Sequence, residues 1–210
     1  MIRVLVVDDH AVVRRGVVQI VGEAAEMRCT GEAATGRDAL RLAAENEYDV
    51  AVLDIHLPDG SGLDVLKQLR AFKPGLPVLI LSMYPEQQYA TRALKAGAAG
   101  YLTKESVPGE LVAALRAVSR GERYVSRALA GALADQVAGA AGPEPHQALS
   151  DREDQVLRLL AAGKTVSQIA EELALSVKTV STYRGRILAK LGLETTAALV
   201  RYALERGLVE

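Results

Sequence analysis

The sequence predicts two domains: a parallel α/β domain, then a smaller domain made only of helices. Across residues 2–120, five short apolar runs alternate with five segments of helical spacing. Residues 138–148, AGAAGPEPHQA, combine small residues with two prolines and lack apolar periodicity, as a linker does. Beyond this linker the sequence shows helical periodicity alone, divided by glycines and capping residues.

The apolar runs of the first domain are the expected strands, because a short apolar run that ends at turn or polar residues is typical of a buried parallel strand. They span residues 2–7, 28–33, 50–53, 77–81 and 100–103. The expected helices span residues 10–21, 36–46, 87–96 and 108–120, and a further one begins near Leu63 and ends at Pro74. Alternation of this kind implies a sheet covered on both faces, and the flavodoxin-like strand order 2-1-3-4-5 is the candidate topology.

Composition restricts the class of protein. Half of the 210 residues are apolar, so the chain can bury a real core, and a net charge of −1 by itself favours neither a nucleic acid nor a membrane as partner. We expect no membrane span, and Asp8 and Asp9 interrupt the N-terminal apolar run in a way that argues against a signal peptide. The single cysteine, Cys29, cannot form an intrachain disulfide and is expected to be a small core residue. A cytoplasmic protein fits these features.

Polar side chains follow four of the five expected strands. Asp8 and Asp9 follow the first strand, Asp54 the third, Ser82 the fourth and Lys104 the fifth. Because the carboxyl ends of parallel strands lie on one edge of a sheet, these groups should gather in one crevice, where open α/β sheets bind ligands. Solvated loop residues are the plain alternative, but five complementary groups at strand ends favour a functional site.

Carboxylates packed together require a cation or shifted pKa values. Two of them ~4 Å apart, at an effective dielectric constant of ~20, repel each other by on the order of 4 kcal/mol. Mg²⁺ prefers oxygen ligands and also suits phosphate, and an aspartate can accept a phosphoryl group. Mg²⁺, Lys104 and Ser82 would then position that group and stabilise its charge. The three histidines, His10, His56 and His146, show no metal-ligand spacing.

Over residues 2–120 these features resemble the receiver domain of bacterial two-component response regulators. The matching residues are Asp8-Asp9, Asp54 followed by Leu57-Pro58, Ser82 and Lys104. The resemblance implies that Asp54 is the phosphoacceptor, that Ser82 is the switch hydroxyl and that Lys104 contacts the phosphoryl group. It also implies Tyr101 as the aromatic switch residue, although spacing alone predicts an ordinary half-buried strand aromatic. The implied Mg²⁺ ligands are Asp8, Asp9, Asp54 and the backbone carbonyl of His56, whose side chain should face solvent.

The second domain should hold four short helices, spanning about 150–162, 165–173, 177–191 and 196–206. Their expected N-caps are Ser150, Thr165 or its neighbour, Ser176, and Thr195 or Thr196. The turn at 174–176 has helix-turn-helix spacing. One face of the third helix should pack on the bundle; it carries Val177, Val180, Arg184, Ile187, Leu188 and Leu191.

The opposite face of the third helix is polar and basic. It carries Lys178, Ser181, Thr182, Gly185 and Arg186. A solvated basic face is the plain alternative to a nucleic-acid interface. Gly185 favours the interface, because glycine costs about 1 kcal/mol in a helix interior unless something must approach closely.

Residues 149–210 resemble the LuxR-type helix-turn-helix of the NarL/FixJ class. The matching residues are Leu149-Ser150, Arg152-Glu153, Val156-Leu157, Ala162-Gly163, Ile169-Ala170, Leu173, Ser176, Thr179-Val180 and Lys190-Leu191-Gly192. The sequence departs from the family at Ser181 and Tyr183, where lysine and histidine are common, and at Gln155, where glutamate is. The resemblance places Lys178, Ser181, Thr182 and Gly185 toward the major groove, and Thr179, Tyr183 and Arg186 toward phosphate.

Together the resemblances imply a DNA-binding response regulator, with a receiver at 1–122, a linker helix and flexible linker at 123–148, and a DNA-binding domain at 149–210. A sensor histidine kinase would phosphorylate Asp54. Phosphorylation would release the helix-turn-helix and favour a homodimer on inverted half-sites of double-stranded promoter DNA. RNA polymerase is a further candidate partner, and no membrane partner is expected. The candidate dimer face, for which bundle packing is an equal explanation, comprises Leu199, Ala203 and Leu204.

Two other functions stay open. A phosphatase of the haloacid dehalogenase type also has a nucleophilic aspartate after a strand, but it needs a second aspartate where His56 stands. A phosphate-independent binding protein would use the receiver only for contacts. We expect a regulator and not an enzyme, apart from the Mg²⁺-dependent phosphoryl transfer and dephosphorylation at its own Asp54.

Overall fold

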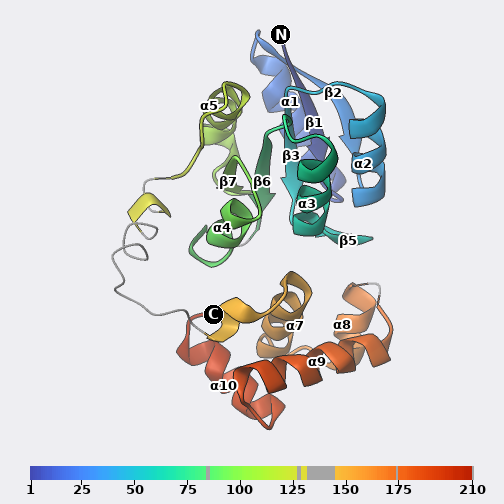
Figure 1. Ribbon diagram of the computed structural model, residues 1–210, viewed down its shortest axis with the longest axis vertical. Helices are drawn as coiled ribbons and strands as arrows, with labels where there is room; N and C mark the ends of the chain where they lie inside the picture. The colour runs from blue at the N-terminus through green and yellow to red at the C-terminus, as the bar shows by residue number, and fades with distance from the viewer. Residues whose placement is uncertain (84–85, 127–128, 132–144, 174, 210) are drawn as a thin grey trace. The chain divides into compact units, whose positions relative to one another are not determined.

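The computed structural model describes residues 1–83, 86–126, 129–131, 145–173 and 175–209. The chain divides into two compact units, Met1–Ala138 and Gly139–Glu210 (Figure 1). Of the expected linker helix and flexible linker at 123–148, residues 127–128 and 132–144 fall outside the described residues, while the Ala130 N–H donates to the carbonyl oxygen of Ser126 at 3.0 Å and Leu129 is fully buried. Within the described ranges, no helix is both long and apolar enough to cross a membrane.

A five-stranded parallel sheet forms the centre of the first unit. The strand order is β2-β1-β3-β6-β7. Because β6 and β7 are the fourth and fifth strands of this sheet along the chain, this is the predicted order 2-1-3-4-5, and it confirms the flavodoxin-like fold. The register places Val7 opposite Leu53 and Ser82 opposite Thr103, so the carboxyl ends of these strands share one edge. The strands are β1 (Ile2–Val7), β2 (Met27–Ala33), β3 (Val50–Asp54), β6 (Val78–Ser82) and β7 (Gly100–Thr103).

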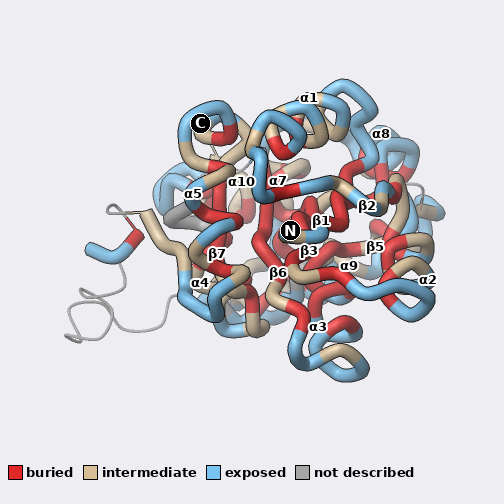
Figure 2. Tube along the Cα trace, turned by 90° about the horizontal axis from the view of Figure 1, so that it is seen from above, coloured by how far each residue is buried: buried red, intermediate tan, exposed pale blue. Residues whose placement is uncertain are grey.

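Helices cover both faces of the sheet. Alternate strand residues point to opposite faces, so Leu5 belongs to one core cluster and Val6 to the other. β3 and β6 are buried along their whole length, which explains their unbroken apolar runs (Figure 2). The helices are α1 (Ala11–Glu23) and α5 (Val107–Ser119) on one face, and α2 (Gly36–Glu45), α3 (Gly62–Phe72) and α4 (Glu86–Lys95) on the other.

A short hairpin follows β3, where the sequence pattern indicated only a turn. Its antiparallel strands are β4 (His56–Leu57) and β5 (Gly60–Ser61). At its end, the Gly62 N–H donates to the carbonyl oxygen of Ile55 at 2.7 Å. A Cβ atom at Gly62 would lie 1.9 Å from the carbonyl oxygen of Asp54. Only glycine therefore lets the chain fold back this closely on the end of β3.

In the part of the second unit that the structure describes, every regular element is a helix. These elements are η1 (Pro145–Ala148), α7 (Asp151–Ala161), α8 (Val166–Glu172), α9 (Val177–Leu191) and α10 (Thr196–Glu205). The side chains of Ser150, Thr165, Ser176 and Thr195 accept hydrogen bonds from backbone N–H groups of the first turns, which confirms the predicted N-caps.

The predicted packing face of α9 is mostly confirmed. Val180 and Ile187 are fully buried, and Arg184, Leu188 and Leu191 are half-buried. The prediction was wrong for Val177, whose exposed fraction is 51%. This residue directly follows the cap Ser176, one turn before the helix enters the core at Val180.

The buried guanidinium of Arg158 links α7 to the end of the second unit. Arg158 Nε lies 2.8 Å from Asp154 Oδ2, and both side chains are buried. Arg158 Nη1 also donates to the carbonyl oxygen of Leu208 at 2.6 Å. The guanidinium thus joins one turn of α7 to the chain beyond α10.

Candidate functional site

Asp8, Asp54 and Lys104 meet at the carboxyl edge of the sheet. Lys104 Nζ lies 2.7 Å from Asp8 Oδ2 and 2.7 Å from Asp54 Oδ2. The exposed fractions of the three side chains are only 1%, 2% and 5%, respectively. The ends of β1 and β3 and the residue after β7 supply these groups, so the parallel register brings distant parts of the sequence into contact.

The charges in this pocket do not balance. Two buried carboxylates share one ammonium, which leaves one negative charge uncompensated. Burial raises the pKa of the Asp54 carboxyl from 3.8 to about 6; Lys104 opposes this shift, and the charge of Asp8 adds to it. Burial also works against the charge of Lys104, but the two carboxylates outweigh it and raise the pKa of this amine. A further cation would relieve the repulsion.

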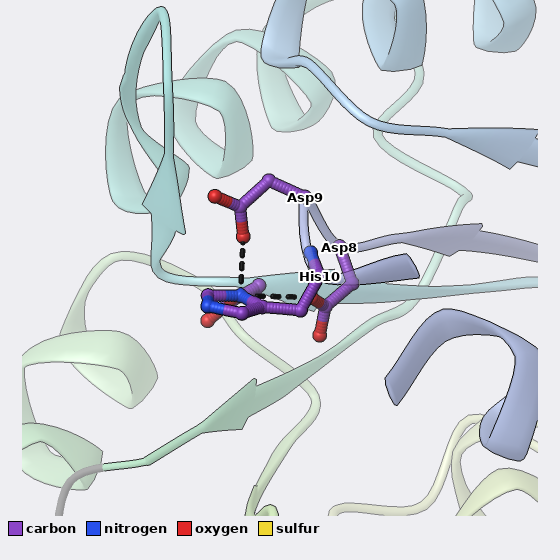
Figure 3. Close-up of side chains that lie close together, drawn as sticks. Asp8, Asp9 and His10 are labelled. Carbon is purple, nitrogen blue, oxygen red and sulfur yellow. Dashed lines mark hydrogen bonds and ion pairs between the residues drawn. The ribbon is translucent and has the colours of Figure 1, made fainter. Parts of the chain in front are cut away.

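Asp9 and His10 lie at the exposed side of the same pocket (Figure 3). One potential ligand atom from each of Asp8, Asp9, His10 and Asp54 can be chosen so that all four lie within 4.8 Å of one another. Asp9 Oδ1 is 2.6 Å from His10 Nδ1. The three histidines show no metal-ligand spacing in the sequence, but the structure places His10 Nδ1 within this group of potential ligand atoms. Its position directly after two strand-end aspartates was the signal in the sequence.

Ser82 and Tyr101 are both fully buried. Ser82 ends β6, and its carbonyl oxygen accepts a hydrogen bond of 2.8 Å from the Lys104 N–H. Tyr101 belongs to the same core cluster as Tyr89 of α4 and is fully buried, so the expectation of a half-buried side chain was wrong. The reason is that α4 covers this face of β7.

His56 stands beside Asp54 in the loop after β3. Its backbone N–H donates to Asp54 Oδ1 at 3.2 Å. The residue is half-buried, whereas the sequence predicted a solvent-facing side chain.

Some residues on the polar face of α9 are exposed, and others are half-buried. Lys178, Thr182, Gly185 and Arg186 are exposed, and Thr179, Ser181 and Tyr183 are half-buried. The Thr182 hydroxyl donates to the carbonyl oxygen of Lys178 at 2.9 Å. Tyr183 packs against the core of the unit, so only part of it is available to a partner.

Gly185 has open space beside it. A Cβ atom placed there would meet nothing within 4 Å among the described residues. Packing inside the chain therefore does not explain a glycine in this helix interior. Lys178 and Arg186 are the long basic side chains on the exposed face, since Lys190 is paired with Glu153 at 2.6 Å.

The structure leaves one of the three residues of the candidate dimer face on α10 exposed. Leu199 and Ala203 are fully buried in the helical core, as the alternative of bundle packing predicts. Leu204 has an exposed fraction of 53% and is the residue of the three that can meet a partner. The helical pattern did not show which of its apolar positions the bundle would bury.

Two family models match the chain. The response regulator receiver domain matches residues 4–116, and the bacterial regulatory proteins of the luxR family match residues 147–203. The chain belongs to the NarL/FixJ class of two-component response regulators. It is thus a DNA-binding response regulator. This family membership excludes the alternative of a phosphatase of the haloacid dehalogenase type.

Similar proteins cover the whole chain. Response regulator GacA of Pseudomonas aeruginosa is 37% identical over 211 residues, which span 100% of this chain and 99% of GacA. DNA-binding transcriptional activator DevR/DosR of Mycobacterium tuberculosis is 40% identical over 99% of this chain and 97% of its own length. A structure of the Salmonella typhimurium response regulator RcsB has a TM-score of 0.61 and 27% identity, over 96% of this chain and 97% of RcsB.

Proposed function

We propose that this response regulator is switched by phosphorylation of Asp54. The observation that carries the proposal is the buried contact of Asp8, Asp54 and Lys104 at the carboxyl edge of the sheet. An Asp54 oxygen at this place has an ammonium 2.7 Å away to hold an incoming phosphoryl oxygen. The phosphoryl donor is a sensor histidine kinase, as the family implies.

The donor set around Asp54 suits Mg²⁺. Three carboxylates offer hard oxygen ligands, and the excess negative charge of the buried groups favours a divalent ion. Asp8, Asp9, Asp54 and the backbone carbonyl of His56 would hold it. When bound, Mg²⁺ supplies charge neutralisation for the phosphoryl group and its developing negative charge. Lys104 contacts the phosphoryl oxygens, while Ser82 and Tyr101 respond to the new charge as switch residues.

The output of the switch is DNA binding by α9. Lys178, Ser181, Thr182 and Gly185 face the major groove, and Thr179, Tyr183 and Arg186 lie toward phosphate. Phosphorylation frees this helix and favours a homodimer on inverted half-sites, with Leu204 at the contact. A solved structure described as two RcsB dimers bound to two parallel DNAs supports this proposal by analogy, as does RcsB bound to a promoter with a phosphomimetic.

Replacement of Asp54 by asparagine tests the input. Full-length protein is treated with Mg²⁺ and a small-molecule phosphodonor, and intact mass, oligomeric state and DNA affinity are measured. We expect wild-type protein to gain one phosphoryl group, dimerise and bind DNA more tightly, and Asp54→Asn to do none of these. Asp49→Asn is the matched control, because it makes the same change just before β3 at the other edge of the sheet. Phosphodonor-dependent DNA binding that survives in Asp54→Asn would contradict the proposal, whereas wild-type DNA binding that does not respond to the phosphodonor would favour phosphate-independent binding.

The salt dependence of affinity tests the output. If Lys178 and Arg186 each neutralise one phosphate in both protomers of the dimer, Lys178→Ala/Arg186→Ala should reduce the slope of log affinity against log salt by about 3.6. Lys67→Ala, in the first unit, is the control for a lost surface charge. An unchanged slope in the double variant would show that α9 does not meet the DNA backbone through these side chains.

A further inference from the structure

The segment Asp8–His10 places an imidazole nitrogen among the carboxylates of the acidic pocket (Figure 3). His10 Nδ1 lies 2.6 Å from Asp9 Oδ1 and 3.5 Å from Asp8 Oδ1. The donor set within 4.8 Å therefore contains one nitrogen as well as oxygens. The functions proposed above for the receiver make no use of this nitrogen.

The backbone holds His10 at the mouth of the pocket. Its N–H donates to Asp8 Oδ1 at 2.8 Å, and its carbonyl oxygen accepts from the Arg14 N–H at 3.0 Å as α1 begins. The side chain of His10 makes no capping bond to the helix, although the residue is its N-cap. Its exposed fraction of 62% leaves the ring accessible from solvent. The ring is therefore placed by the backbone beside Asp9 and not by packing against the core.

A divalent ion can bind between His10 Nδ1 and the Asp9 carboxylate. Ligands bound at right angles, with metal bonds of about 2.1 Å, lie about 3 Å apart. The present contact of 2.6 Å needs to open by only a few tenths of an ångström. A neutral imidazole with its proton on Nε2 then offers the Nδ1 lone pair to the ion.

We propose that His10 Nδ1 becomes a ligand when the pocket binds a divalent ion that accepts nitrogen. This inference rests on the proposed function, because it assumes that Asp8, Asp9 and Asp54 bind a metal. Mg²⁺ prefers oxygen and keeps its waters, so His10 contributes little to Mg²⁺ binding. Co²⁺ and Zn²⁺ accept imidazole readily, so His10 raises the affinity of the pocket for them relative to Mg²⁺.

Co²⁺ is the probe, because an imidazole bound to it gives ring-proton NMR signals shifted far outside the normal range. Full-length protein is titrated with Co²⁺ and then with Mg²⁺, and both affinities are measured. We expect one set of shifted imidazole signals, which Mg²⁺ displaces. His10→Asn should lose these signals and bind Co²⁺ at least about tenfold more weakly, with Mg²⁺ affinity changed less than about threefold. Val12→Ala, two residues on and exposed, should behave as the wild type.

Three NMR outcomes would each overturn the inference: no shifted imidazole signal in the wild type, signals that persist in His10→Asn, or signals that Mg²⁺ fails to displace. Equal loss of Co²⁺ and Mg²⁺ affinity in His10→Asn would also overturn it, because His10 would then only support the loop. Failure of wild-type protein to bind Mg²⁺ is a distinct result, since it would refute the proposed function on which the inference rests.

Discussion

Asp54→Asn should stabilise the receiver at neutral pH and leave its stability unchanged in acid. The pKa of Asp54 in the folded protein is about 6, against an ordinary value of 3.8, because burial disfavours the carboxylate. The folded state therefore holds the proton more tightly than the unfolded chain does. The stability that this adds is complete below about pH 4 and is lost as the pH rises through about 6.

The magnitude follows from the size of the shift. At 1.36 kcal/mol for each pKa unit, the wild type loses up to about 3 kcal/mol between pH 4 and pH 7. Asparagine has nearly the same shape and no such titration, so the variant keeps this stability. The pKa of about 6 already includes the ion pair of Asp54 with Lys104, because this ion pair lowers the pKa that burial raises. Wild type and variant should thus be equally stable near pH 4 and differ by about 3 kcal/mol near pH 7.

Hydrogen exchange of β1 and β3 peptides in a urea series measures unfolding of the receiver within the full-length protein. EDTA is present throughout, because a bound divalent ion would stabilise only the wild type. The pH dependence of the difference is the decisive quantity, since Asp54 titrates in the wild type alone and groups outside its pocket titrate alike in both proteins. A difference that is independent of pH, or a variant less stable than the wild type at pH 7, would refute the reasoning.

Three other substitutions test the architecture by urea unfolding. Lys104→Met should cost about 3–5 kcal/mol at pH 7.5 in EDTA, because it leaves two buried carboxylates without their ammonium, and much of this should return at pH 5. Gly62→Ala should cost at least about 3 kcal/mol, because its Cβ meets a backbone oxygen, whereas Gly60→Ala, with open space, should cost less than about 1 kcal/mol. Arg158→Met should destabilise the helical unit by about 3–5 kcal/mol and raise exchange around Leu208, which loses its buried donor.

The sheet and its strand ends were predictable, because local pattern determines them. A strand buried on both faces must be apolar throughout, so its first charged residue marks where it leaves the core, as Asp54 does. Short crossover connections then left one strand order as the candidate. The site could be predicted to the same extent, since strand ends in parallel register meet whatever lies between them in the sequence.

Contacts set by side-chain direction or by distant chain segments were not predictable. The hairpin after β3 depends on Gly62 meeting Ile55, and two residues of strand are too short to leave a periodic pattern. The position of His10 after two aspartates indicates that it is near the pocket, but the sequence does not show that its ring nitrogen lies 2.6 Å from Asp9 Oδ1. Leu199 is apolar and lies at a helical position, but only the packed bundle shows that it is interior while Leu204 is not.

The loop after Asp54 is fastened at both ends, which determines where an added charge can act. The Asp59 carboxylate accepts hydrogen bonds from the N–H groups of Gly36 and Arg37, at 2.8 and 2.9 Å, and so anchors the hairpin to the first turn of α2. Gly62 closes the loop against Ile55 at the start of α3. A phosphoryl group on Asp54 would therefore meet a fixed backbone on this side. On the other side, two carboxylates hold the Lys104 ammonium, so a phosphoryl group that attracted it would draw it away from one of them. The backbone N–H of Lys104 donates a hydrogen bond to the carbonyl oxygen of Ser82. A movement of Lys104 would therefore also act on the ends of β6 and β7.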